Sequence, residues 1–465
     1  MQMAVRAPGC ALLRAIAALL SLAAPAALAA ISADELKELG TSATSKFTPM
    51  GAERAGNAAG TIPAWDGGLK EAPTGTKFER GKSYGDPFPN DKPLFTISSE
   101  NWEKYKDNLS PGQIAMLKQY PTFKMPVYPS RRTALFPQKH YEQTRECAQK
   151  AVLAADNNGV TGCKGGVPFP LPKNGYEVMW NHNLRYWGDT FETQFVHIAP
   201  TRAGDYTATD FEFQADFHYG NLTLPAADVI PNRRVNYMQT VTGPARLAGE
   251  VILIHENVDF SKEARSAWIY NPGQRRVRLA PTVAYDNPIV GADGQRTVDD
   301  GFMFNGSLDR YDWKLVGKKE MYVPYNSYKL SSNTLKYTDV IRPGHLNPEH
   351  LRYELHRMWV VEATLKPGTS HLYAKRVMYV DEDSWMVTLT DKYDARGALW
   401  RTAENHSVIL YDMNLFFPTA DVHYDILNGR YIAMGLRNEK STFYMPTKKT
   451  AADFTPQALR GLGVR

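Results

Sequence analysis

The chain has 465 residues, of which 43% are hydrophobic and 22% are charged, with 54 Lys and Arg against 49 Asp and Glu. The formal net charge of +5 is small, and the charges are mixed along the whole length. This balance excludes the strongly basic composition of a nucleic-acid-binding protein, so we expect no nucleic-acid partner. The length exceeds that of a usual single domain, but no low-complexity linker divides the chain.

Residues 1–29 have the pattern of a secretory signal peptide. Arg6 and Arg14 provide a positive region, residues 15–28 are almost uninterruptedly apolar, and small residues close the segment at Ala27-Leu28-Ala29. We predict cleavage after Ala29 and export to the periplasm of a Gram-negative bacterium. The apolar stretch is shorter than the about 20 residues of a bilayer span, which makes a retained anchor the less favoured alternative. No later stretch reaches 18 apolar residues, so we do not expect an integral membrane protein.

Two cysteines follow the signal peptide, Cys147 and Cys163, with a turn-like Asn157-Asn158-Gly159 between them. In an oxidising periplasm such a pair is expected to form a disulfide, which contributes roughly 3 kcal/mol in the chain-entropy model. Metal binding is the alternative, but other ligands at a useful spacing are lacking nearby.

The first part of the mature chain is irregular. Residues 30–137 are dense in Pro and Gly, with short helical signals at residues 99–109 and at Ser110-Pro111-Gly112-Gln113, a capping-box pattern. Such a segment cannot build a core alone. We therefore expect residues 30–190 to form an irregular, partly helical wrap that merges with a sheet core at residues 191–465.

Two longer helices are predicted within this wrap. The first covers residues 138–156. The second is indicated by bulky side chains at helical spacing, namely Tyr176, Met179, Trp180, Leu184 and Trp187. This stripe either packs onto a sheet or partly lines a ligand cavity, and we take Trp180 and Trp187 as the candidates for cavity lining.

From residue 193 onward the pattern changes to strands, many of them alternating and rich in β-branched and aromatic residues. The predicted strands are residues 194–199, 234–241, 250–257, 265–270, 275–279, 355–365, 371–380, 385–393 and 431–436. Few helices intervene, so the sheet should be mainly antiparallel. Because a sheet of about ten strands curls or closes, we predict an α+β fold with a large curled sheet covered by helices.

The sequence lacks the common catalytic motifs: a nucleophile elbow, a phosphate-binding loop, a dinucleotide fingerprint and a His-Glu-Xaa-Xaa-His pair. His182 and His197 stand alone and are interpreted as hydrogen-bonded structural residues. The acidic clusters Asp299-Asp300 and Asp381-Glu382-Asp383 could do acid–base work or bind a cation, or they are ordinary acidic turns. We predict no catalytic residues, no cofactor and no metal, with a hydrolase kept as an alternative.

One predicted hairpin supplies further candidates for ligand binding. Trp268 and Tyr270 lie on the same face of a strand, so both can point into a cavity. In the next strand Arg276 and Arg278 share a face and could bind an anionic head group, since Arg pairs bidentately with carboxylate or phosphate. The alternative for the two arginines is a solvated sheet face.

Several motifs carry a family resemblance: FTPMGAERAGN at residues 47–57, GTIPAW at 60–65, GGVPFPLPKNGYEVMWNHNLRYW at 165–187, YDWKLVGKKE at 311–320, and the hairpin segments 268–278 and 375–385. In these motifs the chain resembles a family of exported bacterial proteins known as domain of unknown function 1329. That family is similar to the periplasmic lipoprotein carriers of the LolA and LolB type, which implies an open barrel formed by an antiparallel sheet curled around helices. Its members are often encoded beside an outer-membrane protein and a transporter of the resistance-nodulation-division (RND) type, which implies these as partners.

We therefore expect a periplasmic binding or carrier protein for a lipid, a lipoprotein or another hydrophobic compound, working with an envelope transporter. The alternatives are an envelope adaptor that binds no small ligand and a hydrolase acting on an apolar or polymeric substrate. The carrier hypothesis requires an apolar cavity that the helices and the N-terminal wrap leave unfilled.

Overall fold

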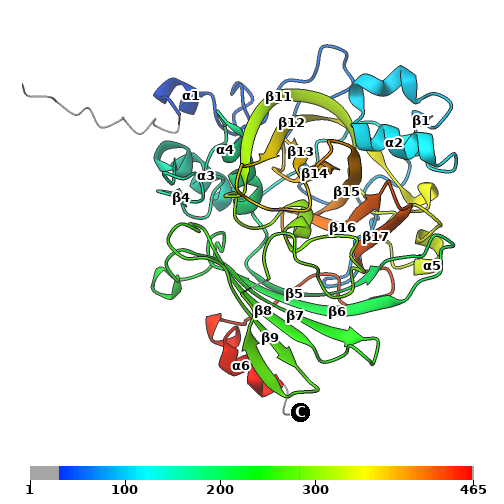
Figure 1. Ribbon diagram of the computed structural model, residues 1–465. Coiled ribbons are helices and arrows are strands. Elements are labelled where there is room, and N and C mark those ends of the chain that lie inside the picture. The colour runs from blue at the N-terminus through cyan, green and yellow to red at the C-terminus, as the bar shows by residue number, and fades with distance from the viewer. Residues whose placement is uncertain (1–30, 282, 463–465) are drawn as a thin grey trace, which may run out of the picture.

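The computed structural model describes residues 31–281 and 283–462 (Figure 1), so the predicted signal peptide lies outside the described residues. One large sheet dominates the fold. Its strands in chain order are β1 (Phe95–Ile97), β2 (Met125–Val127), β5 (Thr190–Ile198), β6 (Ala208–Phe217), β7 (Arg233–Gly243), β8 (Val251–Asn257), β9 (Ser266–Asn271), β10 (Arg276–Leu279), β11 (Tyr311–Pro324), β12 (Tyr353–Leu365), β13 (Lys375–Asp381), β14 (Val387–Tyr393), β15 (Leu399–Leu410), β16 (Leu415–Asp425), β17 (Arg430–Leu436) and β18 (Met445–Pro446).

The strand order is β1-β2-β12-β13-β14-β15-β16-β17-β5-β6-β7-β8-β9-β10. Two strands lie off this path: β11 pairs with β12, and β18 pairs with β5. All pairings are antiparallel except the contact of β12 with β2, at Tyr353 and Val127. Figure 1 shows that β11 to β17 curl around the inside of the molecule, while β5 to β9 extend below them. The sheet curls without closing, so the predicted open, mainly antiparallel sheet is confirmed.

The expected strand count was too low. Among the described residues, fourteen strands, β5 to β18, lie from residue 190 onward, and the unpredicted ones include β6, β11, β15 and β16. All eleven residues of β16 are buried, because both faces of this strand are covered. Thr419, Asp421 and His423 nevertheless alternate with apolar residues, so β16 carries a strand pattern that could have revealed it.

The helices are short and lie around the sheet. They are α1 (Ala33–Lys37), α2 (Pro111–Gln119), α3 (Gln138–Lys150), α4 (Gly175–Leu184), α5 (Tyr337–Val340) and α6 (Pro456–Leu462), with 3-10 turns η1 (Trp102–Asn108), η2 (Ala226–Asp228), η3 (Val298–Met303), η4 (Pro348–His350) and η5 (Ala451–Asp453). The predicted capping box is confirmed, since the side chain of Ser110 accepts from the backbone of Gln113 at 3.1 Å and the reverse bond is also formed. Among the described residues, none of these helices is long and apolar enough to cross a bilayer.

Two helix ends differ from the prediction. Helix α3 ends at Lys150 instead of residue 156, because the chain then turns into a small hairpin of β3 (Val152–Leu153) and β4 (Val160–Thr161). Helix α4 ends at Leu184, where Arg185 adopts an extended backbone. Trp187 therefore lies beyond the helix and not on its stripe.

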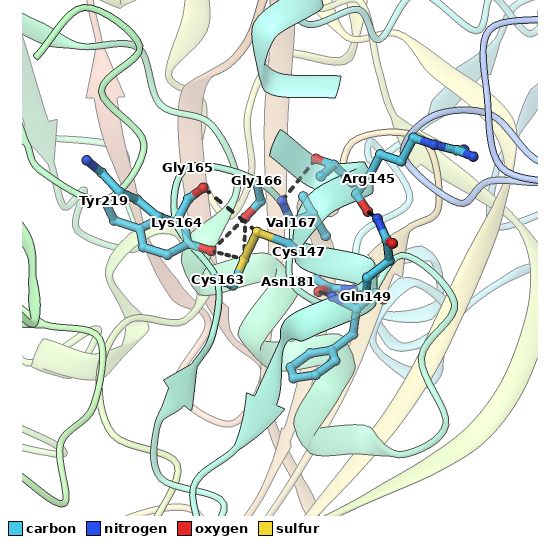
Figure 2. Close-up of a disulfide and its surroundings, with 12 residues drawn as sticks. Arg145, Cys147, Gln149, Cys163, Lys164, Gly165, Gly166, Val167, Asn181 and Tyr219 are labelled. Carbon is cyan, nitrogen blue, oxygen red and sulfur yellow. Dashed lines mark hydrogen bonds between the residues drawn. A yellow bond between two sulfur atoms is a disulfide. The ribbon is translucent and has the colours of Figure 1, made fainter. Parts of the chain in front are cut away.

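A disulfide joins Cys147, in α3, to Cys163, just after β4, with the Cα atoms 4.7 Å apart (Figure 2). It closes the β3–β4 hairpin onto the helix, as the sequence predicted. Tyr219 contacts this junction from the sheet, because its hydroxyl donates to the carbonyl oxygen of Gly166 at 2.7 Å. The disulfide thus fixes part of the N-terminal wrap next to the strand region.

Candidate ligand-binding cavity

A cavity of about 190 Å³ lies between one face of strands β5 to β9 and a segment, residues 283–305, that crosses this face. We call this segment the cover segment. The strand side of the wall follows the two-residue period of a strand, with Gln239 and Val241 from β7 and Ile252 and Ile254 from β8. The residues between them point to the opposite face.

The deeper wall of the cavity is aromatic. Phe195 from β5 and Phe211 and Phe213 from β6 line it, and their rings are in contact, with centroids 5.5 Å apart for Phe195 and Phe211. Val298 and Phe302 of the cover segment lie on the other side. Apolar groups on both sides make this a space that favours a hydrophobic ligand over water.

The cover segment also forms the rim of the cavity. Val290 lines the cavity and is 37% exposed, and its neighbour Pro288 is exposed as well. The cavity therefore approaches solvent at residues 288–290, while its aromatic end is buried. A ligand has an apolar entrance at this rim.

A second, smaller cavity of about 20 Å³ adjoins the buried end. Phe213, Tyr237, Phe302 and Asn305 line both spaces. A volume of this size is enough for one water molecule or one small polar group. We call it the inner cavity, and Phe302 lies at its boundary with the main cavity.

Phe302 is held in an unusual backbone conformation, with φ 52° and ψ 39°. This left-handed region is disfavoured for an aromatic residue and persists only where the surroundings impose it. The ring of Phe302 makes an edge contact with Trp187, with centroids 4.6 Å apart. The kink in η3 therefore places an aromatic side chain between the two cavities.

Charged residues also line the main cavity. Arg437, from the end of β17, is buried and donates to Thr193 Oγ1 at 2.9 Å and to the carbonyl oxygen of Thr419 at 3.0 Å. Burial lowers the pKa of Arg437 to about 9. Asp421 of β16 accepts a hydrogen bond from Asn405. Burial raises the pKa of Asp421, and the bond from Asn405 only partly offsets this effect.

Two other polar residues at the cavity have unsatisfied groups. Arg296 of the cover segment has no hydrogen-bond partner for Nε and Nη1 among the described residues, although both atoms are buried. The same holds for Nδ1 of His197, whose ring lies 4.4 Å from that of Phe211. Burial, together with the charge of Arg296, lowers the pKa of His197 well below its ordinary value. His197 is therefore neutral at pH 7, while the guanidinium of Arg296 keeps its charge.

The two helix-region candidates lie in different places. Trp180 is fully buried in α4, and its Nε1 donates to the carbonyl oxygen of Asn157 at 3.0 Å. Trp187 lines the inner cavity. Trp180 is therefore part of the packed core, which is one of the two interpretations of the stripe. Trp187 lies at a cavity.

Trp268 and Tyr270 share one face of β9, as expected, but this face packs against the C-terminal segment. Their neighbours there are Phe454 and Leu459, the latter in α6. The residue between them, Ile269, points the other way and lines the cavity. We therefore correct the assignment of the cavity-facing residue in β9 to Ile269.

Arg276 and Arg278 are exposed on β10, the last strand of the sheet. Arg278 pairs in register with Ile269 of β9, so both residues lie on the face that bears the cavity. Arg278 is one strand farther out than the cavity wall. The arrangement agrees with the solvated-face interpretation, and the proposed head-group role of these two residues stays a prediction.

The first acidic cluster is held by internal ion pairs. Arg376 Nη2 lies 2.8 Å from Asp299 Oδ2, and Lys392 Nζ lies 2.7 Å from Asp300 Oδ1. Burial alone would raise the pKa of both carboxyls, but the neighbouring cations outweigh it and hold both pKa values below the ordinary range. The hydrolase alternative predicts raised pKa values here, so these two residues do not support it.

The second acidic cluster is similarly engaged. His356, Asp381 and Asp383 place possible ligand atoms within 4.8 Å of one another. However, Arg132 donates to both carboxylate oxygens of Asp383, and His356 Nε2 lies 3.2 Å from Glu354 Oε2. Burial and the charge of Asp383 raise the pKa of Asp381 to about 6. Arg132 and His356 thus tie this cluster into a buried charge network, and the absence of a metal here stays a prediction.

An open curled sheet with a mainly apolar cavity that approaches solvent at one rim thus defines the class of this protein. The chain belongs to the DUF1329 family of proteins of unknown function, whose model matches residues 96–460, and the resemblance drawn from the motifs is confirmed. A chain of Pseudomonas aeruginosa, called uncharacterized protein PA3922, is 47% identical over 438 residues, which are 93% of this chain and 94% of that protein.

Two solved structures are also similar. A DUF1329 family protein from Desulfovibrio piger aligns with 61% of this chain and 97% of its own, at 14% identity and a TM-score of 0.42. The LolA superfamily protein NE2245 from Nitrosomonas europaea aligns with 61% of this chain and 98% of its own, at 15% identity and a TM-score of 0.35.

Proposed function

We propose that this protein is a periplasmic carrier that binds a hydrophobic molecule, such as a lipid, in the cavity beneath the cover segment. The observation that carries the proposal is the space of about 190 Å³ with aromatic and aliphatic walls. Transfer of an apolar group from water into such a space is favourable by about 25 cal/mol for each Å² of surface buried.

The size of the cavity limits what it can enclose. Ligand sites commonly measure about 300–1,000 Å³. At roughly 30 Å³ for each group of the size of water or a methylene, 190 Å³ corresponds to about six such groups. The ligand therefore presents one chain to the cavity, and a longer chain emerges at the rim formed by residues 288–290.

The proposed location rests on two features of the chain. The sequence of residues 1–29 has a signal-peptide pattern, and the disulfide between Cys147 and Cys163 is typical of an oxidising compartment. In the periplasm, a carrier would receive or deliver its ligand at a membrane. An RND-type transporter and an outer-membrane protein remain the proposed partners.

Native mass spectrometry of the full protein, isolated from its own periplasm, tests the proposal. We expect an additional mass that organic extraction removes and that a fluorescent fatty acid replaces. In a matched pair of variants, Ile252→Trp fills the cavity and should weaken probe binding at least tenfold, whereas Val316→Trp should not. Val316 is a suitable control because it is 60% exposed on β11.

Two results would count against the carrier. One is a protein that arrives without ligand and binds none of the probes. The other is equal probe affinity for both variants, which would place the probe outside this cavity. Melting temperatures of both variants should be compared with that of the natural protein, to exclude unfolding as the cause of lost binding.

A further inference from the structure

We infer that the ligand is a single-chain amphiphile with an anionic head group, and that this head group lies at the buried end of the cavity, against Arg296. The inference rests on the proposed function. It adds which chemical class is bound and in which orientation.

The first argument is an excess of hydrogen-bond donors at the buried end. Arg296, which lines the main cavity, has two buried N–H groups, at Nε and Nη1, without an acceptor among the described residues. Across Phe302, the inner cavity is lined by Arg185, Trp187 and Arg234. Each of these three side chains also has a buried nitrogen without an acceptor: Arg185 Nη2, Trp187 Nε1 and Arg234 Nε.

These groups are donors only. A guanidinium or an indole N–H cannot accept a hydrogen bond, so the four side chains cannot satisfy one another. A buried donor without a partner costs about 1–3 kcal/mol, and more when the group is charged. The missing component is therefore an acceptor, and a carboxylate or phosphate oxygen is the strongest one.

The second argument is an imbalance of charge. Within the described part of the chain, Arg185, Arg296 and Arg437 have no carboxylate oxygen within 4.0 Å, whereas other buried arginines, such as Arg132 and Arg376, are ion-paired. Asp421 is the acid that lies near all three, and its own carboxylate is already bonded by Asn405. Asp300 and Asp299 also act on Arg296, but Lys392 and Arg376 already pair with these two carboxylates.

Uncompensated buried charge is expensive, at several kcal/mol for each ion. An anion bound at this end would pair with Arg296 directly and would also lie in the positive potential of the other arginines. His197 does not compete for this role, because its imidazole is neutral at pH 7. The same residues would bind an uncharged or cationic head group poorly.

The third argument is the direction of the cavity. Its rim at residues 288–290 is apolar, with Pro288 and Val290 exposed, whereas Nε and Nη1 of Arg296 are buried. A head group at Arg296 leaves the chain along Phe195, Phe211 and Ile254 toward the rim. Since the adjoining inner cavity measures only about 20 Å³, the head group stays in the main cavity beside Arg296, where a compact one such as carboxylate or phosphate fits best.

Isothermal titration of the delipidated full protein with dodecanoate, dodecyl phosphate and dodecanol, each below its micellar concentration, tests the inference. We expect both anions to bind at least tenfold more tightly than dodecanol. The better of the two anions identifies the head group as a carboxylate or a phosphate. Arg296→Met should reduce the affinity for both anions to that for dodecanol and leave dodecanol binding unchanged.

Two further variants serve as controls. Arg396→Met, at a position where the side chain is 85% exposed, should leave all three affinities unchanged. Arg278→Met tests a head group at the outer strand instead. If this substitution removes the preference for anions and Arg296→Met does not, the head group binds at the surface and our orientation is wrong.

The possible failures are distinguishable. Equal affinities of the natural protein for dodecanoate, dodecyl phosphate and dodecanol would overturn the head-group inference but leave the carrier function standing. Binding of none of the three would contradict the carrier function itself. Should Arg296→Met fail to fold, the comparison of the three ligands on the natural protein still tests whether an anionic head group is preferred. Arg296→Lys, which retains the charge, should keep this preference.

Discussion

Arg132 donates from Nε and Nη2 to the two carboxylate oxygens of Asp383, at 2.9 and 2.7 Å, and both side chains are almost completely buried. The same guanidinium donates to the backbone carbonyl of Glu53 at 2.7 Å. Arg132 thus joins two parts of the N-terminal segment to the turn between β13 and β14. In the sequence, Asp383 is a candidate for catalysis or metal binding. Its buried ion pair with Arg132 indicates a structural role.

Replacement of Arg132 by Met should therefore destabilise the protein strongly. The substitution leaves Asp383 as an unpaired buried charge, for which a loss of about 3–5 kcal/mol is expected in urea unfolding. Arg80→Met is the control, because Arg80 is 64% exposed and lies 3.8 Å from Asp412, so its loss should cost about 0.5 kcal/mol or less. Similar costs for both variants would show that the buried pair does not anchor the segment.

The contribution of Glu404 to stability should fall as the pH rises from 5 to 8. Burial raises the pKa of Glu404 to about 7, although Tyr353 donates to its carboxylate at 2.8 Å. The folded state therefore binds a proton that the unfolded state releases near its ordinary pKa of 4.5, so the stabilisation is complete below that pH and is lost as the pH rises through 7. The loss is at most on the order of 3 kcal/mol.

Glu404→Gln removes the titrating group and keeps an acceptor for Tyr353. The free energy of unfolding of the natural protein minus that of the variant should therefore fall as the pH rises from 5 to 8. A difference that stays constant over this range would contradict the raised pKa of Glu404.

Removal of the disulfide should destabilise the protein without changing its fold. The bridge spans a sequence separation of 16 residues, for which the chain-entropy model gives about 3 kcal/mol. The double variant with Cys147→Ser and Cys163→Ser should lose this amount in thermal unfolding, and a reductant should shift the natural protein but not the variant. An unchanged melting temperature of the variant would show that the loop is already fixed by contacts such as that of Tyr219.

The two faces of β9 should respond differently to substitution. Trp268→Ala removes a side chain that packs with Phe454 and Leu459, so it should lower stability by about 2 kcal/mol and leave dodecanoate affinity unchanged. Ile269→Trp fills the cavity and should weaken dodecanoate binding at least tenfold. Titration of both variants checks the assignment of faces, and the reverse result would restore Trp268 as a ligand contact.

The sequence by itself determined much of the architecture. The alternation of Trp268, Ile269 and Tyr270 identified a strand and showed which residues share a face. The two cysteines after the signal-like segment specified the disulfide, and the motifs specified the family. These features are local, or depend on few possible partners, so they can be read without knowledge of the packing.

Only the tertiary structure decided what each face meets. A period of two separates two faces, but it does not say that α6 covers one of them and the cover segment the other. Likewise, Arg296 looks like any surface arginine in the sequence, and the burial of its Nε and Nη1 atoms depends on the placement of residues 283–305 across β5 to β9. Long-range contacts of this kind set burial and charge balance, which is why the residues that line the cavity, Arg296 among them, were not predicted, although strands beside it such as β7, β8 and β9 were.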